Sequence, residues 1–254
     1  MNQEGNIEVW KSIAQHSSSI STKLRKHMLD FCHNIDKTSK ELAVMDLVRR
    51  VECNLKAVMS LSILAMKSNG SVYFKLPIGL LLRSCFTDCL MGLYLQQLSE
   101  DGVQKMLDDL SKEYTKSLFE RFEVYKDKVS IPFDDEFFQT LYIGQLEDHF
   151  LDYLTINEKY KSGSDHPFYQ MWSVQQFERH QTSKIKKSLA TNSSYAPLVN
   201  RLYGYFKYFS QYEHFSGPGH GDTLADFGED NVSFPKALDS LAEATSIMAT
   251  VYAN

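Results

Sequence analysis

Two charged side chains lie in the most apolar stretch of the chain, and their setting is the first sign of a site. The stretch from residue 76 to residue 95 reads LPIGLLLRSCFTDCLMGLYL, with Arg83 and Asp88 near its middle. A charge in such surroundings needs a partner, and residues five apart on an ideal helix point about 140° away from each other. We therefore expect each to meet groups from neighbouring helices, which is how a polar pocket forms inside a bundle. The alternative is a buried ion network that only holds the register of the helices.

A second set of chemistry-bearing residues ends the aromatic-rich segment LYGYFKYFSQYEHFS, residues 202–216. Ser210 and His214 lie one helical turn apart on one face, and Tyr203 and Lys207 continue that face. Serine and histidine are the nucleophile and base of acyl transfer, but that chemistry also needs a third group and an oxyanion site. A core histidine with a serine hydrogen-bond partner is the simpler interpretation. A third is that His214 faces Arg83 across a pocket.

The glycine-rich segment that follows, GPGHGD at 217–222, adds residue types that bind metals. With His214 just before it, this segment brings three such residues within nine positions: His214, His220 and Asp222. Zinc sites need three or four ligands with supporting groups, and the chain has no HExxH motif. We therefore expect no metal or other cofactor. The glycine patterns of Rossmann and P-loop folds are also absent, which excludes those nucleotide folds.

A basic stretch without Asp or Glu runs from Arg179 to Tyr212 and includes five tyrosines and two phenylalanines. Such a stretch can bind phosphates while its aromatic rings stack on bases, which makes RNA or a nucleotide the candidate ligand. The alternative is a basic helix that complements its own dipole and the acidic tail, since residues 216–254 hold six acidic and one basic side chain. The pI of 5.9 is not that of a dedicated nucleic-acid binder. The candidate ligand-binding residues are Lys184, Lys186, Lys187, Arg201 and Lys207.

The elements that must position these residues are helices. The chain has 12 glycines and 6 prolines, too few for a many-turned β architecture, and its 13% of aromatic residues supply a sizeable core. Hydrophobic periodicity predicts an all-α bundle of about eight helices. Their expected ranges are 7–34, 38–68, 75–98, 99–125, 134–160, 166–190, 197–215 and 233–252.

The positions of the glycines and prolines, which interrupt helices, also predict the organisation of the chain. Asn69-Gly70 predicts the end of the second helix, and the third helix is apolar almost all round, as a central helix would be. Six of the eighteen glycines and prolines fall in 217–235. We therefore expect one domain over 1–254, with a Gly-rich acidic loop at 216–234 and a C-terminal helix at 235–253.

The first residues of the chain and its cysteines predict the cellular compartment of the protein. The sequence MNQEGNIEVWKS lacks the basic and apolar regions of a secretory signal, and the two central charges of the apolar stretch would be costly in a membrane. No CxxC pair is present. We expect a cytoplasmic protein without membrane contact, whose four cysteines are reduced core residues: Cys32, Cys53, Cys85 and Cys89.

At LLLRSCFTDCLMGLYL and LYGYFKYFSQYEHFS the sequence resembles a group of all-helical bacterial proteins. Their pattern is a buried arginine followed by an acid in one helix, and an aromatic-rich Ser-x-x-x-His that ends a later helix. The group is similar to a distant branch of the HEPN-like helical domains, often linked to RNA cleavage in toxin and defence systems. The resemblance implies an HEPN-like fold with Arg83, Asp88, Ser210 and His214 as the site residues. HEPN ribonucleases use an Arg-x4–6-His motif, which this chain lacks, so an Arg83–His214 pair from different helices would have to do the acid–base work.

Three function classes follow from the sequence. The leading one is a helical protein whose polar pocket around Arg83, Asp88 and His214 binds or processes RNA, a nucleotide or another phosphorylated ligand. The second is a non-catalytic interaction or oligomerisation module, for example a homodimer, in which the buried charges are structural. The third is a metal-assisted hydrolase that uses His214, His220 and Asp222. The sequence leaves open whether the protein is an enzyme.

Overall fold

The computed structural model describes residues 3–32, 37–107, 182–191, 194–212, 227 and 230–250. Every regular element in that part of the chain is helical, which confirms the predicted all-α class there. The chain divides into two compact units, Met1–Val103 with His180–Asn254, and Gln104–Arg179. Nearly all the described residues belong to the first unit, which alone is described below. The single domain and the total of about eight helices stay predictions.

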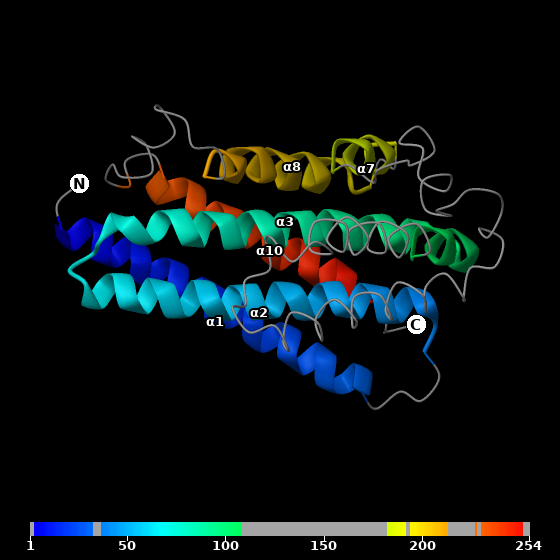
Figure 1. Ribbon diagram of the computed structural model, residues 1–254, viewed down its shortest axis with the longest axis horizontal. Helices are drawn as coiled ribbons and strands as arrows, with labels where there is room; N and C mark the ends of the chain where they lie inside the picture. The colour runs from blue at the N-terminus through cyan, green and yellow to red at the C-terminus, as the bar shows by residue number, and fades with distance from the viewer. Residues whose placement is uncertain are drawn as a thin grey trace, which may run out of the picture. The chain divides into compact units, whose positions relative to one another are not determined.

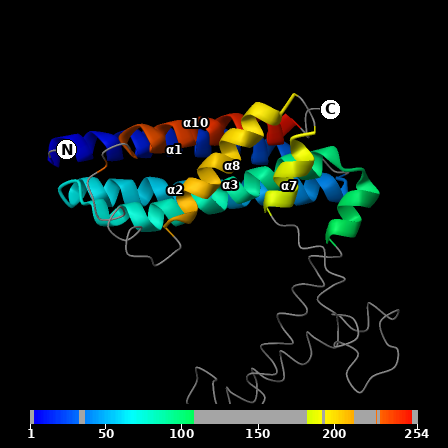
Figure 2. The same ribbon diagram turned by 90° about the horizontal axis from the view of Figure 1, so that it is seen from above.

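Four long helices lie side by side in this unit (Figure 1 and Figure 2). Helix α1 packs against α2 and α10, α2 packs against α3, and α10 also packs against α3, so the four close around a shared core. Two shorter helices, α7 (Thr182–Leu189) and α8 (Ala196–Ser210), lie over α3 on the side away from α2 (Figure 1), and α8 also contacts α10. The four long helices are α1 (Gln3–Cys32), α2 (Ser39–Lys67), α3 (Lys75–Gln97) and α10 (Asp230–Ala249).

Local sequence signals set both ends of α2. The Thr38 hydroxyl accepts a hydrogen bond from the backbone N–H of Glu41 at 3.2 Å, and the Glu41 carboxylate accepts one from the N–H of Thr38 at 2.8 Å. This reciprocal pair is a capping box. Beyond the helix, Asn69 and Gly70 have φ of 56° and 76°, in the left-handed region that ends helices. The predicted stop is confirmed, and a 3₁₀ turn, Val72–Phe74, leads into α3.

Helix α3 is the central helix, as predicted, because it contacts α2, α7, α8 and α10. Its buried residues include Ile78, Leu82, Phe86 and Leu90. Among the described residues, the stretch Val72–Gln97 is long and apolar enough to cross a membrane by length and composition. Since 61% of its apolar window is buried inside the protein, and a central bundle helix has the same composition, this is weak evidence for a membrane span.

A cluster of aromatic rings ties the end of α8 to α1 and α10. The ring of Phe209 meets that of Phe234 edge to face at 5.1 Å between centroids, and Phe227 meets both Phe234 at 5.7 Å and Trp10 at 4.6 Å in the same manner. Edge-to-face pairs at such distances add to the stability that burial alone provides. The cluster therefore fixes the end of α8, where the candidate Ser210 lies.

Two helix boundaries differ from the prediction. Helix α8 ends at Ser210 instead of near 215, because the chain turns at Gln211 and Tyr212 while still facing the core. Helix α10 begins at Asp230, so the expected helix start at 233 and the expected loop over 230–234 are wrong. Pro235 lies inside this helix, near its start, where it removes one backbone hydrogen bond.

The remaining helix predictions are covered only in part. Residues 100–107 are helical, and Ser99 Oγ accepts a hydrogen bond from the N–H of Gly102 at 3.2 Å, as the predicted helix start at 99 requires. The end of the predicted helix 166–190 corresponds to α7. The predicted helix 134–160 and the loop 216–226 lie outside the described residues.

The cysteines are free, but they are not all core residues. Cys85 and Cys89 are buried in α3, as predicted. Cys32 and Cys53 are exposed, and that part of the prediction is wrong. On α2, Val51 and Leu55 take the inward positions on either side of Cys53, which leaves the thiol on the outer face.

Candidate functional site

The structure brings together Arg83 of α3 and Ser210 of α8, which are 127 residues apart in the sequence. Nε of Arg83 donates a hydrogen bond to Ser210 Oγ at 3.2 Å. The guanidinium carbon of Arg83 also lies 5.2 Å from the centroid of the Phe206 ring, within cation–π distance. The last turn of α8 therefore holds the guanidinium at two points, one edge by a hydroxyl and one face by a ring.

The hydrogen bonds of Ser210 define its chemical role. Its hydroxyl donates to the backbone carbonyl of Phe206 at 2.7 Å, while its oxygen accepts from Arg83. A serine nucleophile must instead give its proton to a base. Ser210 is thus an acceptor that orients Arg83. His214 lies outside the described residues, so its predicted pairing with Arg83 stays a prediction.

Asp88 contacts α2 instead of α8. Its Oδ1 lies 3.1 Å from Nη2 of Arg50, and the Asp88 side chain is 3% exposed whereas that of Arg50 is 62% exposed. Its other oxygen, Oδ2, is buried and has no hydrogen-bond partner among the described groups. Burial raises the pKa of Asp88 from 3.8 to about 6, and the Arg50 guanidinium offsets part of that rise. The expectation that each of Arg83 and Asp88 meets a neighbouring helix is confirmed, but the two meet different helices, Arg83 on α8 and Asp88 on α2.

Two buried thiols lie close to Asp88 in the sequence of α3. Burial raises the pKa of Cys85 and of Cys89 well above the usual thiol value, and the negative charge of Asp88 adds to the effect. A thiol is reactive as its thiolate, so neither group is a nucleophile at neutral pH. The surroundings of Asp88 are therefore those of a buried structural charge.

Two of the other candidate residues, Lys186 and Lys207, converge on one outer surface of α3, α7 and α8. The ammonium of Lys186 lies 5.5 Å from the ring centroid of Tyr203, and that of Lys207 lies 5.9 Å from it. The centroid of the Tyr203 ring is in turn 5.8 Å from that of the Phe206 ring, and the guanidinium of Arg83 lies over the Phe206 ring. These five residues define what we call the basic–aromatic surface.

The charge of this surface is not compensated locally at its two lysines. Neither Lys186 nor Lys207 has a carboxylate partner among the residues that the structure describes, and α7 and α8 contain no acidic residue. Lys184 and Lys187 are exposed on α7 as well. Like charges that share one ring repel each other, so an anion bound between them would be stabilised.

Arg201 has a different partner. Its Nη2 forms an ion pair with Oε2 of Glu243 on α10, and both side chains are about half exposed. The alternative to ligand binding was that the basic segment pairs with the acidic tail, and for Arg201 the structure shows this pairing. Arg201 therefore joins α8 to α10, and the ligand-binding role expected of it stays untested.

Sequence reasoning missed two partners in these contacts. Phe206 is one of many rings in its segment, although its position four residues before Ser210 places it on the face of that serine. Arg50 lies in α2, and no pattern in the sequence links it to Asp88. The predicted metal ligands His214, His220 and Asp222 lie outside the described residues; within those residues no group of three His, Cys, Asp or Glu side chains is placed to hold a metal.

Comparisons with known proteins add no family to this picture. No family model matches the chain, and no curated protein or solved structure matches it either. The chain is an all-α protein with a basic–aromatic surface, and its function is inferred from that surface.

Proposed function

We propose that this chain is an HEPN-like helical protein of about eight helices that binds RNA on its basic–aromatic surface. The observation that carries the proposal is the convergence of Lys186 and Lys207 on the ring of Tyr203 without a carboxylate partner in the described part of the chain. The HEPN-like assignment itself depends on the resemblance of two segments in the sequence.

An extended polyanion fits this surface better than a small molecule does. Its side chains are exposed or half-buried and come from three helices, whereas small-molecule sites are concave and enclosed. Phosphates spaced along a strand can meet several cations at once, and each contact releases counterions. The Arg83 guanidinium, with Ser210 on its edge and Phe206 on its face, adds a fixed cation to the two lysines.

The proposal concerns binding first. Cleavage of the RNA is the further step that the HEPN-like resemblance implies, and it would need His214 within reach of Arg83. Because Ser210 gives its proton to a backbone carbonyl, a phosphodiester would not be attacked by this serine. Any acid–base chemistry would fall to the histidine.

The test is fluorescence anisotropy with a short labelled single-stranded RNA at about 0.1 M salt. The double variant Lys186→Gln/Lys207→Gln should bind about tenfold more weakly, since it loses two phosphate contacts. The matched control is Lys236→Gln, an exposed lysine of α10 outside the surface, which should bind like the wild type. Equal affinity of all three proteins would overturn the proposal.

The interaction module is the second candidate, and one observation favours it. At the start of α3 and just before it, Tyr73, Leu76 and Leu80 are 72%, 43% and 40% exposed. Clustered apolar exposure marks protein contacts. A homodimer that uses this face would dissociate in Leu76→Gln, which sedimentation at several concentrations measures. The metal-assisted hydrolase stays a third hypothesis, tested by metal analysis of the purified protein.

A further inference from the structure

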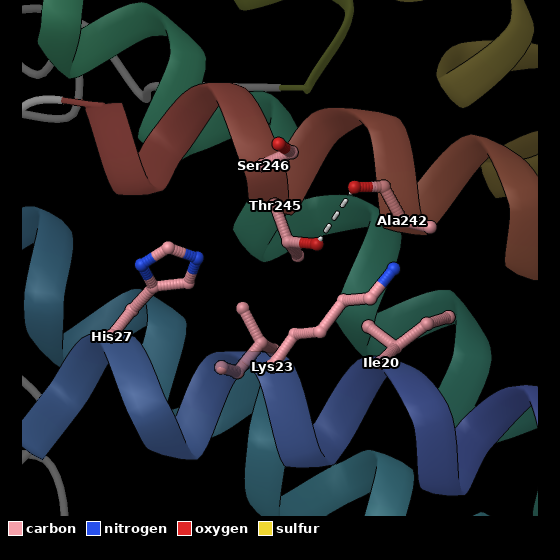
Figure 3. Close-up of a pocket in the computed structure, with 7 residues that line it drawn as sticks. Ile20, Lys23, His27, Ala242, Thr245 and Ser246 are labelled. Atoms are coloured by element: carbon pink, nitrogen blue, oxygen red, sulfur yellow. Dashed lines mark hydrogen bonds between the residues drawn. The ribbon is translucent and has the colours of Figure 1, made fainter.

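A pocket between α1 and α10 lies on residues that the proposed function does not use (Figure 3). Its volume is about 70 Å³, comparable to two water molecules at about 30 Å³ each. Ile20 and Leu24 of α1 and Ala242 of α10 form its apolar lining. Lys23 and His27 extend from α1 towards α10 at its edge, one helical turn apart (Figure 3).

The polar groups at this edge favour an anion. Lys23 brings an ammonium with three donors, and His27 brings a ring N–H. The hydroxyl of Thr245 is directed to its own helix, since it lies 2.8 Å from the carbonyl oxygen of Leu241 and 3.2 Å from that of Ala242 (Figure 3). No Asp or Glu lines the pocket.

No nearby carboxylate in the described part of the chain neutralises the positive charge at this edge of the pocket. The α1 segment 23–27, KLRKH, has four basic residues and no acid. On α10, Glu243 is engaged by Arg201, and Asp239 lies 3.8 Å from the ring of His16, farther towards the start of both helices. Lys23 and His27 have no carboxylate partner within the described ranges. Both are exposed, so a ligand can reach them directly from solvent.

We propose that this pocket is a site for a small tetrahedral oxyanion, inorganic phosphate, held between the Lys23 ammonium and the His27 ring. Two donors on neighbouring turns of one helix can each bind a separate oxygen of the ion, and charge-assisted hydrogen bonds of this kind are the strong ones. The volume of about 70 Å³ limits the space to a small ion. The site is independent of the basic–aromatic surface, which lies on other helices.

The experiment is a calorimetric titration of the whole protein with inorganic phosphate, with ionic strength held constant by sodium chloride. The wild type should show saturable binding, and Lys23→Gln and His27→Gln should each weaken it at least tenfold. The matched control is Lys26→Gln, an exposed lysine of α1 that does not line the pocket, which should bind within twofold of the wild type.

Two results would overturn the proposal. The first is no saturable binding by the wild type, and the second is an equal loss in Lys23→Gln and Lys26→Gln, which would show diffuse attraction by the basic helix. Thermal melts of the three variants without phosphate exclude unfolding as the cause of a loss. RNA binding by Lys23→Gln should equal that of the wild type, so failure of this site and failure of the RNA surface are told apart.

Discussion

Replacing Asp88 by asparagine should stabilise the protein at neutral pH. The Asp88 carboxylate has one oxygen paired with an exposed Arg50 and the other buried without a hydrogen-bond partner in the described structure. Its pKa is raised, which shows that burial outweighs the attraction of the guanidinium. The folded protein therefore disfavours the charge that the unfolded chain accommodates in water.

The magnitude follows from the two pKa values of this carboxyl group. The pKa is 3.8 in its ordinary state and about 6 in the folded protein, and each unit corresponds to about 1.4 kcal/mol. Because the folded value is the higher one, the unfolded chain loses the proton first as pH rises. The charge then costs about 3 kcal/mol above pH 6, and this cost disappears as pH falls from 6 to below 4. Asparagine has no charge and should remove most of the cost at pH 7.

Urea unfolding of the wild type and of Asp88→Asn at pH 7 and pH 5 measures the effect. The variant should be more stable at pH 7 by up to about 3 kcal/mol, and its advantage should fall to roughly half at pH 5. Asp46→Asn, at an exposed position of α2, is the control and should change stability little at either pH. A variant that is less stable than the wild type at pH 7 would refute the reasoning, because the pair with Arg50 would then be a net stabilising contact.

Three glycines of the helices give further predictions, each measured by thermal or urea unfolding. Gly79→Ala should destabilise the protein by about 1–3 kcal/mol, because the new Cβ would lie 2.7 Å from Cγ of the Tyr212 ring. Gly92→Ala should cost less, since its Cβ would meet the flexible end of Met248; equal losses at both sites would contradict this ranking. Gly204→Ala should stabilise α8 by up to about 1 kcal/mol, because no atom lies within 4 Å of the new Cβ. A loss of stability there would show a contact that the structure does not contain.

Local signals were enough to predict most of the described helices. The end of α2 follows from Asn69-Gly70, because a left-handed turn depends on a few adjacent residues, and the start predicted at 38 coincides with the capping box of Thr38 and Glu41. The central place of α3 follows from its apolar surface on all sides. These features need no knowledge of the tertiary structure.

The errors at α8 and α10 have physical causes. Tyr212 is buried like the apolar residues of α8 although it lies in a turn, so hydrophobic periodicity does not show where that helix ends. Ser233 two residues before Pro235 resembles a helix start, because serine caps and proline favours the first turn. The helix nevertheless begins at Asp230.

The sequence allowed residues of the candidate site to be predicted, but not the contacts that they make. A charge in an apolar helix identified Arg83 and Asp88, yet their partners Ser210 and Arg50 come from other helices. Such contacts depend on how helices pack and rotate against each other. Arg83 and Asp88 were identified because they are charged residues in an apolar segment, and this gives no information about which helix each one faces.

The salt dependence of RNA binding tests the central claim most directly, because it counts the phosphates that the surface contacts. The logarithm of the binding constant should fall linearly with the logarithm of salt concentration, with a slope of about −0.7 per phosphate contact on a single strand. Lys186→Gln/Lys207→Gln should reduce that slope by about 1.4 relative to the wild type. A double variant with the slope and affinity of the wild type would contradict RNA binding at the basic–aromatic surface.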